Sequence, residues 1–291
     1  MKWVWMLFLF AVNSAAGQFY FYDEKYLDQP VLIDIGANIG MMSCLTDLGH
    51  GDKVNKAFQI TRSTFCLEAG FYGEVRWKQL VGARLQFNYG KITAADSVLK
   101  GVGGDAIYRY QRNLHFRSRI LETSVLGILY PLGFIQMGSP PKLNPYFFAG
   151  AGFFHFDPQA LLLGKWTSLA PLRSEGTDPA TYYNRWQTNL LTGMGCSYEV
   201  NGRISTMVEC CFRILHTDYL DDVSTAFIDP DTGERNSEQE EQINALYGLN
   251  RLRQGPNISQ PGAIRGNPGN KDSYFSVRLA VSWTVNRQRI H

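Results

Sequence analysis

The amino-acid sequence predicts an all-β protein, an eight-stranded antiparallel up-and-down transmembrane β-barrel. Three observations lead to this fold class: an export signal, eight segments in which apolar residues alternate with polar or small ones, and a regular alternation of short and long connections. The chain has 291 residues, of which 45% are hydrophobic and 19% charged, so it is long and apolar enough to fold. Its net charge of +2 includes no concentrated basic stripe, so nucleic acid is not an expected partner.

The N-terminus has the features of a secretory signal peptide. Lys2 precedes the apolar run "WVWMLFLFAV", and the small residues Ala15 and Gly17 follow it. This run is too short to span a bilayer as a helix, which requires about 20 residues. We expect cleavage before Gln18. The predicted organisation is a signal peptide (1–17), a periplasmic segment (18–30), a barrel with long outer loops (31–286) and a tail (287–291).

Alternation with period two is the main evidence for strands. From Val31, "VLIDIGANIGMMS" places apolar residues at every second position. The same pattern recurs in "TFCLEAGFYGEVR", "LVGARLQFNYG" and "YFSVRLAVSWTV", and less cleanly in segments 145–157, 186–200 and 203–215. The eighth segment, 116–130, is the weakest because Leu126 and Ile128 fall on its polar face. No long amphipathic helix separates the segments, which argues against a parallel α/β fold.

The lengths of the connections predict how the strands are arranged. Turns at Trp77-Lys78-Gln79 and Asn201-Gly202 are tight, and 131–144 is moderate. The connections near 44–62, 94–114, 158–184 and 217–272 are all long. Short and long connections therefore alternate, and all long loops fall at one end of the sheet, as in outer-membrane barrels.

The polarity of the two faces decides which side meets lipid. An apolar face in lipid requires a closed sheet, because unpaired backbone groups are costly there. The opposite face carries charges of both signs, which we expect inside a filled lumen: Asp34, Glu68, Glu74, Arg84, Glu122, Glu209, Arg213 and Arg278. The alternative is a soluble lipocalin-like barrel with its apolar face inward.

No catalytic, cofactor or metal site is predicted. The five histidines lack metal-ligand spacing, and neither a nucleophile elbow nor a phosphate-binding loop occurs. The stretch "DPDTGE" at 229–234 resembles the start of a calcium-binding loop. Its glycine comes one position too early, however, and no bidentate glutamate follows at the required spacing. The five cysteines form no disulfide framework, and Cys210 and Cys211 are expected on opposite faces of a strand. The aromatic run at 146–156 is expected to form part of a membrane-interface girdle.

Several motifs, taken together, resemble one family. They are "NLHFRSR" at 113–119, "NPYFFAGAGFFHFDP" running into "LLLGKWTSLAPLRSEG", "HTDYLDDVSTAFIDP" at 216–230, and "IRGNPGNKDSYF". In order and spacing the chain is similar to the PorG-like outer-membrane barrel subunit of the type IX secretion system, from about residue 31 to 285. The resemblance implies a location in the Gram-negative outer membrane and contact with a periplasmic ring lipoprotein and its partner subunit. It implies no enzymatic chemistry and no small-molecule substrate.

The resemblance also assigns expectations to particular residues. It includes a loop motif, in which carboxylates are expected to cap turns rather than hold a catalytic metal: Asp218, Tyr219, Leu220, Asp221, Asp222, Val223 and Ser224. The loop at 231–262 is longer and more charged than the family pattern, and we expect it to have little fixed structure. Ring docking is expected at the periplasmic end, through Tyr22, Tyr26 or Phe134.

Two other functions remain open from the sequence. A small outer-membrane enzyme acting on lipid or peptide would need His216, Asp218 and Ser224 to converge. A general structural barrel of the OmpA type, or an adhesin, would need no such site.

Overall fold

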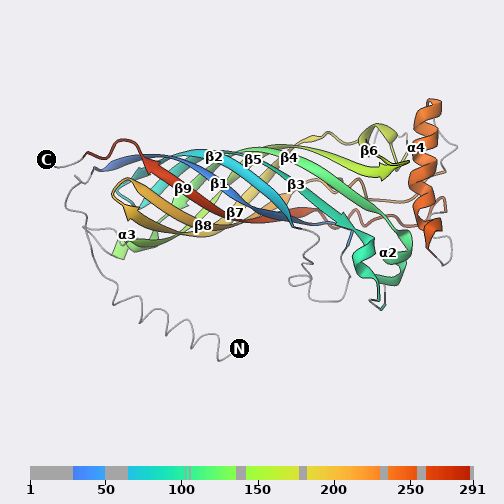
Figure 1. Ribbon diagram of the computed structural model, residues 1–291, viewed down its shortest axis with the longest axis horizontal. Coiled ribbons are helices and arrows are strands. Elements are labelled where there is room, and N and C mark those ends of the chain that lie inside the picture. Colours follow the sequence, from blue (N-terminus) through green and yellow to red (C-terminus); the bar gives the residue numbers. More distant parts are fainter. Residues whose placement is uncertain are drawn as a thin grey trace.

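The computed structural model describes residues 29–49, 65–101, 103–104, 106–135, 142–176, 182–229, 235–253 and 260–288. Within these residues eight strands form one closed antiparallel barrel, which confirms the predicted fold class (Figure 1). Neighbours along the chain pair with each other, and the last strand pairs with the first to close the ring. The barrel strands are β1 (Val31–Leu45), β2 (Cys66–Trp77), β3 (Val81–Ala95), β4 (His115–Leu129), β5 (Leu143–Leu162), β7 (Trp186–Asn201), β8 (Ile204–Leu215) and β9 (Ser273–Thr284).

The wall of the barrel has an apolar outside and a polar inside. On the outside, Ile35 is 49% exposed and Val125 is 61% exposed. Inward-facing neighbours such as Asp34 and Glu122 are buried. A soluble barrel would have the reverse polarity, so this wall is built to stand in a bilayer, with every ladder hydrogen bond satisfied by closure.

The irregular pattern in β4 has a structural cause. Leu126 and Ile128 face inward, where they pack with Tyr130, Tyr146 and Phe148 in an apolar layer of the lumen. The inward face therefore changes from charged to apolar along one strand. A simple polar-inside rule does not predict that change.

The aromatic run in β5 is split between the two faces. Phe147 and Phe153 point outward, whereas the aromatic residues between and beyond them are buried inside the barrel: Tyr146, Phe148, Phe154 and Phe156. The expectation of a membrane-interface girdle is therefore wrong for these four, because the period-two alternation of β5 turns every second ring into the lumen. Cys210 and Cys211 follow the same alternation, one exposed and one buried, as predicted.

The short and long connections lie at opposite ends (Figure 1). At the first end, a turn at 78–80 joins β2 to β3, and the Asn201 side chain accepts hydrogen bonds from the backbone N–H groups of Arg203 and Ile204. Helix α3 (Pro131–Ile135) lies at this end too. If the long loops face outward, this end faces the periplasm.

The opposite, outer end is built from the long connections. They contribute η2 (Asp96–Leu99), α2 (Ala106–Arg112), β6 (Lys165–Ser168), η3 (Ala170–Leu172), α4 (Ser237–Gly248) and η5 (Leu249–Leu252). The short strand β6 pairs only with the outer extension of β5. None of the described helices combines the length and apolar character needed to cross a membrane.

Helix α4 corrects the expectation that the 231–262 loop has little fixed structure. A capping box starts the helix, in which Asn236 and Gln239 exchange side-chain-to-backbone hydrogen bonds. Ile243, Leu246 and Tyr247 then bury one side of the helix against the outer loops. This segment has few apolar residues among many charged and polar ones, so the sequence pattern did not predict the helix.

We predict that a charge in the middle of the outer wall is more costly than one at its edge. Replacing Val125, midway along the apolar face of β4, by Lys should lower the free energy of unfolding in lipid by roughly 2–4 kcal/mol. Leu129→Lys, at the periplasmic edge of the same strand, should cost about 0–1 kcal/mol. Urea unfolding of protein refolded in phospholipid vesicles measures both. Equal losses for the two variants would contradict a lipid-facing wall.

Candidate functional site: a filled lumen beneath a closed outer end

The lumen contains a continuous chain of alternating charges. It runs Asp34–Arg76–Glu74–Arg84–Glu209–Arg278–Glu68–Arg213–Glu122, and we call it the ion chain. Each arginine in it bridges two carboxylates. The side chains are at most 2% exposed except that of Arg76, at 11%.

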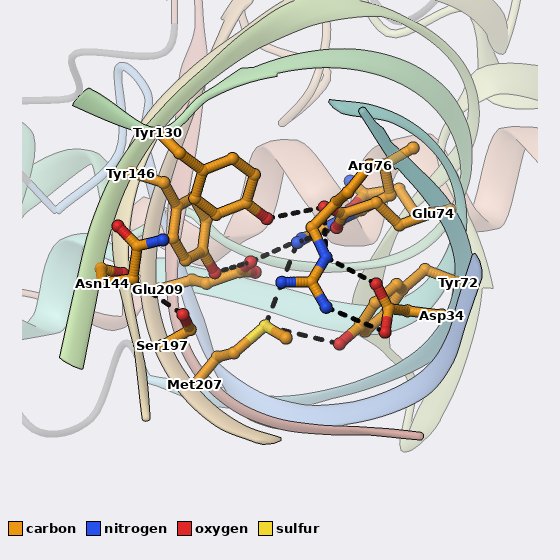
Figure 2. A network of polar contacts seen from close by, with 12 residues as sticks. Asp34, Tyr72, Glu74, Arg76, Tyr130, Asn144, Tyr146, Ser197, Met207 and Glu209 are labelled. Atoms are coloured by element: carbon orange, nitrogen blue, oxygen red, sulfur yellow. Dashed lines mark hydrogen bonds and ion pairs between the residues drawn. The ribbon is translucent and has the colours of Figure 1, made fainter. Parts of the chain in front are cut away.

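The periplasmic half of the ion chain begins with a bidentate ion pair between an arginine and an aspartate. Arg76 donates from Nε and Nη2 to the two oxygens of Asp34, at 2.7 and 3.0 Å (Figure 2). The Thr284 hydroxyl donates to the same carboxylate. Arg76 Nε also lies 4.0 Å from Glu74, which accepts a hydrogen bond from the Tyr130 hydroxyl at 2.6 Å. Side chains from opposite walls thus meet across the lumen.

Arg84 and Glu209 form the centre of the ion chain. Arg84 reaches Glu74 at 2.7 Å and Glu209 at 2.5 Å, and its guanidinium lies 4.4 Å from the Tyr72 ring centroid. Glu209 also accepts hydrogen bonds from Arg278 and from the Tyr146 hydroxyl. Two cations and one hydroxyl therefore surround this buried carboxylate and offset its loss of hydration.

In the outer half of the ion chain, Glu68 is held more loosely than the other carboxylates. Glu68 lies 3.5 Å from Arg278 and 3.7 Å from Arg213, and neither of its oxygens accepts a hydrogen bond. Arg213 continues to Glu122 at 3.2 Å, which also accepts hydrogen bonds from Asn189 and the Tyr274 hydroxyl.

Above the lumen, a second network ties the long loops together. Arg265, which is buried, lies 3.0 Å from Glu175 and 3.2 Å from Asp222, and donates to the Ser174 hydroxyl. Asp222 also accepts hydrogen bonds from the hydroxyls of Ser174 and Tyr183. We call these five residues the outer cluster. They come from two of the long connections, β5–β7 and β8–β9, so the cluster ties these two together at the outer end.

The loop motif is held in place by hydrogen bonds from backbone N–H groups to carboxylates. Glu175 accepts from the N–H groups of Ser224 and Thr225, at 2.7 and 2.9 Å. Asp221 accepts from Val223 N–H and so caps a turn within the motif. Asp222 adopts a left-handed backbone conformation (φ 65°), which places its carboxylate among the outer cluster.

A set of buried aspartates lies beside the outer cluster: Asp47, Asp218, Asp221 and Asp272. Burial, reinforced by the charge of Asp47, raises the pKa of Asp218 to about 7 despite the Ser224 hydroxyl. Burial also raises the pKa of Asp221 and of Asp272 well above the ordinary value, and neighbouring carboxylates add to both shifts. Within the described ranges, no three His, Cys, Asp or Glu side chains are arranged to hold a metal ion.

The structure places the sequence-predicted residues as follows. All eight predicted interior charges lie inside the barrel and belong to the ion chain. The loop motif lies at the outer end. Phe134 lies in α3 at the periplasmic end, whereas Tyr22, Tyr26 and most of the 229–234 stretch fall outside the described residues.

The hypothetical enzyme site is not assembled. His216 is exposed, whereas Asp218 and Ser224 are buried beneath it in the loop. Among the described residues, no hydrogen bond joins His216 to either of them. General acid–base chemistry through the three residues requires them to be in contact or to share a substrate position, and the described hydrogen bonds do not join His216 to the other two.

Three groups of site residues were missed by sequence reasoning. Arg76 shares the polar face of β2 with Glu74, so its alternation was a usable signal. The hydroxyl of Tyr146 was missed because the aromatic run at 146–156 was assigned to the girdle, and that of Tyr130, the last residue of the weakest predicted strand, gave no signal. Arg265 and Glu175 meet from segments about 90 positions apart in the chain, which no local pattern reveals.

Comparison with known proteins finds likeness only among solved structures. No protein-family model and no curated protein matches the chain. Neisserial surface protein A is 7% identical, with 87% of this chain and 97% of that chain covered and a TM-score of 0.42. Ail of Yersinia pestis, in complex with the heparin analogue sucrose octasulfate, is 9% identical over 88% and 100%, with a TM-score of 0.39. OprG from Pseudomonas aeruginosa is 12% identical over 88% and 96%, with a TM-score of 0.38.

We predict that removing one member of the ion chain destabilises the barrel strongly. Glu209→Ala leaves Arg84 and Arg278 facing each other with one carboxylate fewer, and should lower the free energy of unfolding by roughly 3–5 kcal/mol. The control is Arg185→Ala, which breaks the partly exposed pair with Asp157 and should cost about 0–1 kcal/mol. Urea unfolding in vesicles compares them; similar losses would show that the lumen contributes no more than a surface ion pair.

We predict that the outer end loosens as pH rises. Acids whose pKa is raised in the folded state bind more protons folded than unfolded, so their contribution to stability declines from their unfolded pKa up to the folded one. For Asp218 that interval runs from about pH 4 to about 7. Hydrogen exchange of residues 217–225, corrected for intrinsic rates, should therefore accelerate between about pH 4 and about 7 and change little above that.

Asp218→Asn keeps the shape of the side chain and removes its titration, so it should reduce this acceleration. Glu240→Gln, on the exposed side of α4, serves as the control and should leave it unchanged. Exchange that slows with rising pH in the unmodified protein would contradict the assignment.

Proposed function

We propose that this chain is a non-enzymatic outer-membrane component of a protein-secretion apparatus of the type IX kind, docked to the periplasmic ring of that apparatus. The sequence resemblance to the PorG-like family motivates the proposal. Its structural support comes from how the family motifs are used in the fold.

The observation that carries the proposal is that motifs distant in sequence meet at one place. Glu175 ends the second motif, Asp222 belongs to the loop motif and Arg265 to the last one, and the three form the centre of the outer cluster. A combination of motifs that specifies one buried network is stronger support for a family relationship than any motif alone. The network itself is structural, since each of its carboxylates is engaged by protein donors.

The filled lumen defines what role the chain could have in such an apparatus. The ion chain and the apolar layer around Tyr146 occupy the interior. An eight-stranded ring is only wide enough for side chains to fill. A polypeptide in transit would therefore need another route, and this barrel would act as an anchor or adaptor.

The periplasmic end offers an apolar surface for docking. In α3, Phe134 is 56% exposed and Ile135 is 76% exposed, outside the ring of strands. An exposed aromatic beside an aliphatic residue suits the buried centre of a protein interface. We therefore assign ring docking to this surface, with a ring lipoprotein and its partner subunit as the occupants.

A general structural barrel or adhesin is the second candidate, because the described outer end is folded and capped. Helix α4 and the outer cluster present a defined surface beyond the barrel. A surface-binding role would use that end and would be indifferent to α3.

We predict that tagged protein, purified from gently solubilised outer membranes, recovers a stoichiometric ring lipoprotein identifiable by mass spectrometry. Phe134→Asp should reduce that recovery at least tenfold, because it places a charge in the apolar contact. Tyr108→Ala alters a residue of similar exposure on α2, at the outer end, and should leave recovery unchanged.

A barrel that is recovered alone would refute the docking proposal and favour the structural barrel or adhesin. If Phe134→Asp recovers as much lipoprotein as the unmodified protein, a partner is bound, but its contact does not lie on α3.

A further inference from the structure

The outer wall of the barrel has a sharp upper edge on one side. Tyr89 of β3, Leu121 of β4, His155 of β5 and Trp186 of β7 form one outward row of paired residues. Trp186 stacks on Phe153 with ring centroids 5.2 Å apart. Aromatic rings at this level mark the boundary between lipid tails and headgroups.

Directly above this edge the wall carries three cations. Lys91 on β3 pairs in register with Arg119 on β4, and Arg117 lies two positions further along β4. The spacing of strands and residues places them within about 5 Å across and 7 Å along the wall. Lys91 and Arg119 are exposed, and Arg117 is partly so. We call these three residues the cationic patch.

Among the paired residues of the described strands, the one carboxylate in register with the patch is already engaged. Asp157 of β5 pairs with Arg119 across the strands, but its oxygens accept from Ser168 at 2.6 Å, Gln159 at 2.8 Å and Arg185 at 2.9 Å. Within the part of the chain that the structure describes, the side chains of Lys91 and Arg119 form no ion pair or hydrogen bond. Like charges held together on a membrane wall call for an external anion.

Arg117 is fixed in place beside these two. Its guanidinium lies 3.9 Å from the Trp166 ring centroid, and its Nε donates to Gln159 at 3.1 Å. Strand β6, which supplies Trp166, therefore orients one member of the patch. The hairpin formed by β6 and the outer end of β5 thus positions a cation of the patch.

The patch occupies one side of the barrel only. At the outer ends of β1, β2, β8 and β9, the outward residues are uncharged: Met41, Leu67, Ile214 and Phe275. The cations are therefore a local feature among the described strands rather than a ring around the barrel.

We propose that Lys91, Arg117 and Arg119 bind the phosphate groups of a phosphorylated lipid in the outer leaflet. Arginine and lysine side chains at headgroup depth form charge-assisted hydrogen bonds with phosphate oxygens. The acyl chains of the same lipid would lie on the apolar wall directly below, which includes Leu85 and Val125. Soluble anions lack this second contact. The site depends on the barrel standing in a membrane and is independent of any secretion partner.

The test is native mass spectrometry of the full-length protein titrated with diphosphoryl lipid A, its dephosphorylated form, and inorganic phosphate. We expect diphosphoryl lipid A to bind and the dephosphorylated form to bind at least tenfold more weakly. The double variant Lys91→Ala/Arg119→Ala should lower the affinity by roughly 10- to 30-fold, since each headgroup-level cation contributes about a factor of five. Inorganic phosphate at the same ionic strength should not displace the lipid.

A matched double variant controls for loss of charge. Lys78→Ala/Lys100→Ala also removes two exposed cations, one at the periplasmic end and one in the outer loops, and should bind as the unmodified protein does. Far-UV circular dichroism verifies that both variants fold. Equal affinity of the two double variants, equal binding of the dephosphorylated lipid, or displacement by inorganic phosphate would overturn the proposal.

Discussion

The described structure depends on the burial of the ion chain within a closed wall. Its carboxylates and guanidinium groups alternate from Asp34 to Glu122, so no charge in the lumen faces only its own kind. Burying charges in this way seldom adds net stability, because the lost hydration offsets most of the attraction. The buried charges instead favour one register of strand pairing, because a shift of one residue in any strand would turn the charged side chains of that strand towards lipid.

Hydrogen bonds connect the ion chain with the loops of the outer end. Tyr274 donates to Glu122 at the top of the chain, and two residues earlier Asp272 accepts from Leu220 N–H in the loop motif. The start of β9 therefore connects the lumen with the loop motif, which carries Asp222 of the outer cluster. Loops of this length need internal fixation to hold one conformation. Here Arg265 supplies it: its guanidinium reaches Glu175 in the β5–β7 connection and Asp222 in its own, and its backbone carbonyl accepts a hydrogen bond from Arg112 in the β3–β4 connection.

Much of the fold could be predicted from the sequence, because the alternation that signals a strand is also what a membrane wall requires. The charges on β1, β2, β3, β8 and β9 were located inside the barrel for that reason alone. The inward-facing aromatic rings of β5 were not located inside the barrel, because an aromatic side chain is equally compatible with a lipid environment and with a filled lumen. Tyr146 donates to a buried carboxylate, whereas Phe147 next to it meets lipid.

The outer end was beyond sequence reasoning for a different reason. The partners of Arg265 lie about 40 and 90 positions away, and the helix that covers them has few apolar residues. Only the motif at 218–224 indicated that this region is ordered. Its carboxylates do fix turns and loops, but through partners that no local spacing identifies.

The most direct test of a lumen filled by the ion chain is the electrical conductance of the purified protein in a planar lipid bilayer. The structure predicts that inserted barrels leave the bilayer current at its baseline, since charged and aromatic side chains occupy the interior from Asp34 to Tyr274. Reproducible, discrete conductance steps from homogeneous protein would contradict the account, because they would require a continuous water path where the ion chain lies.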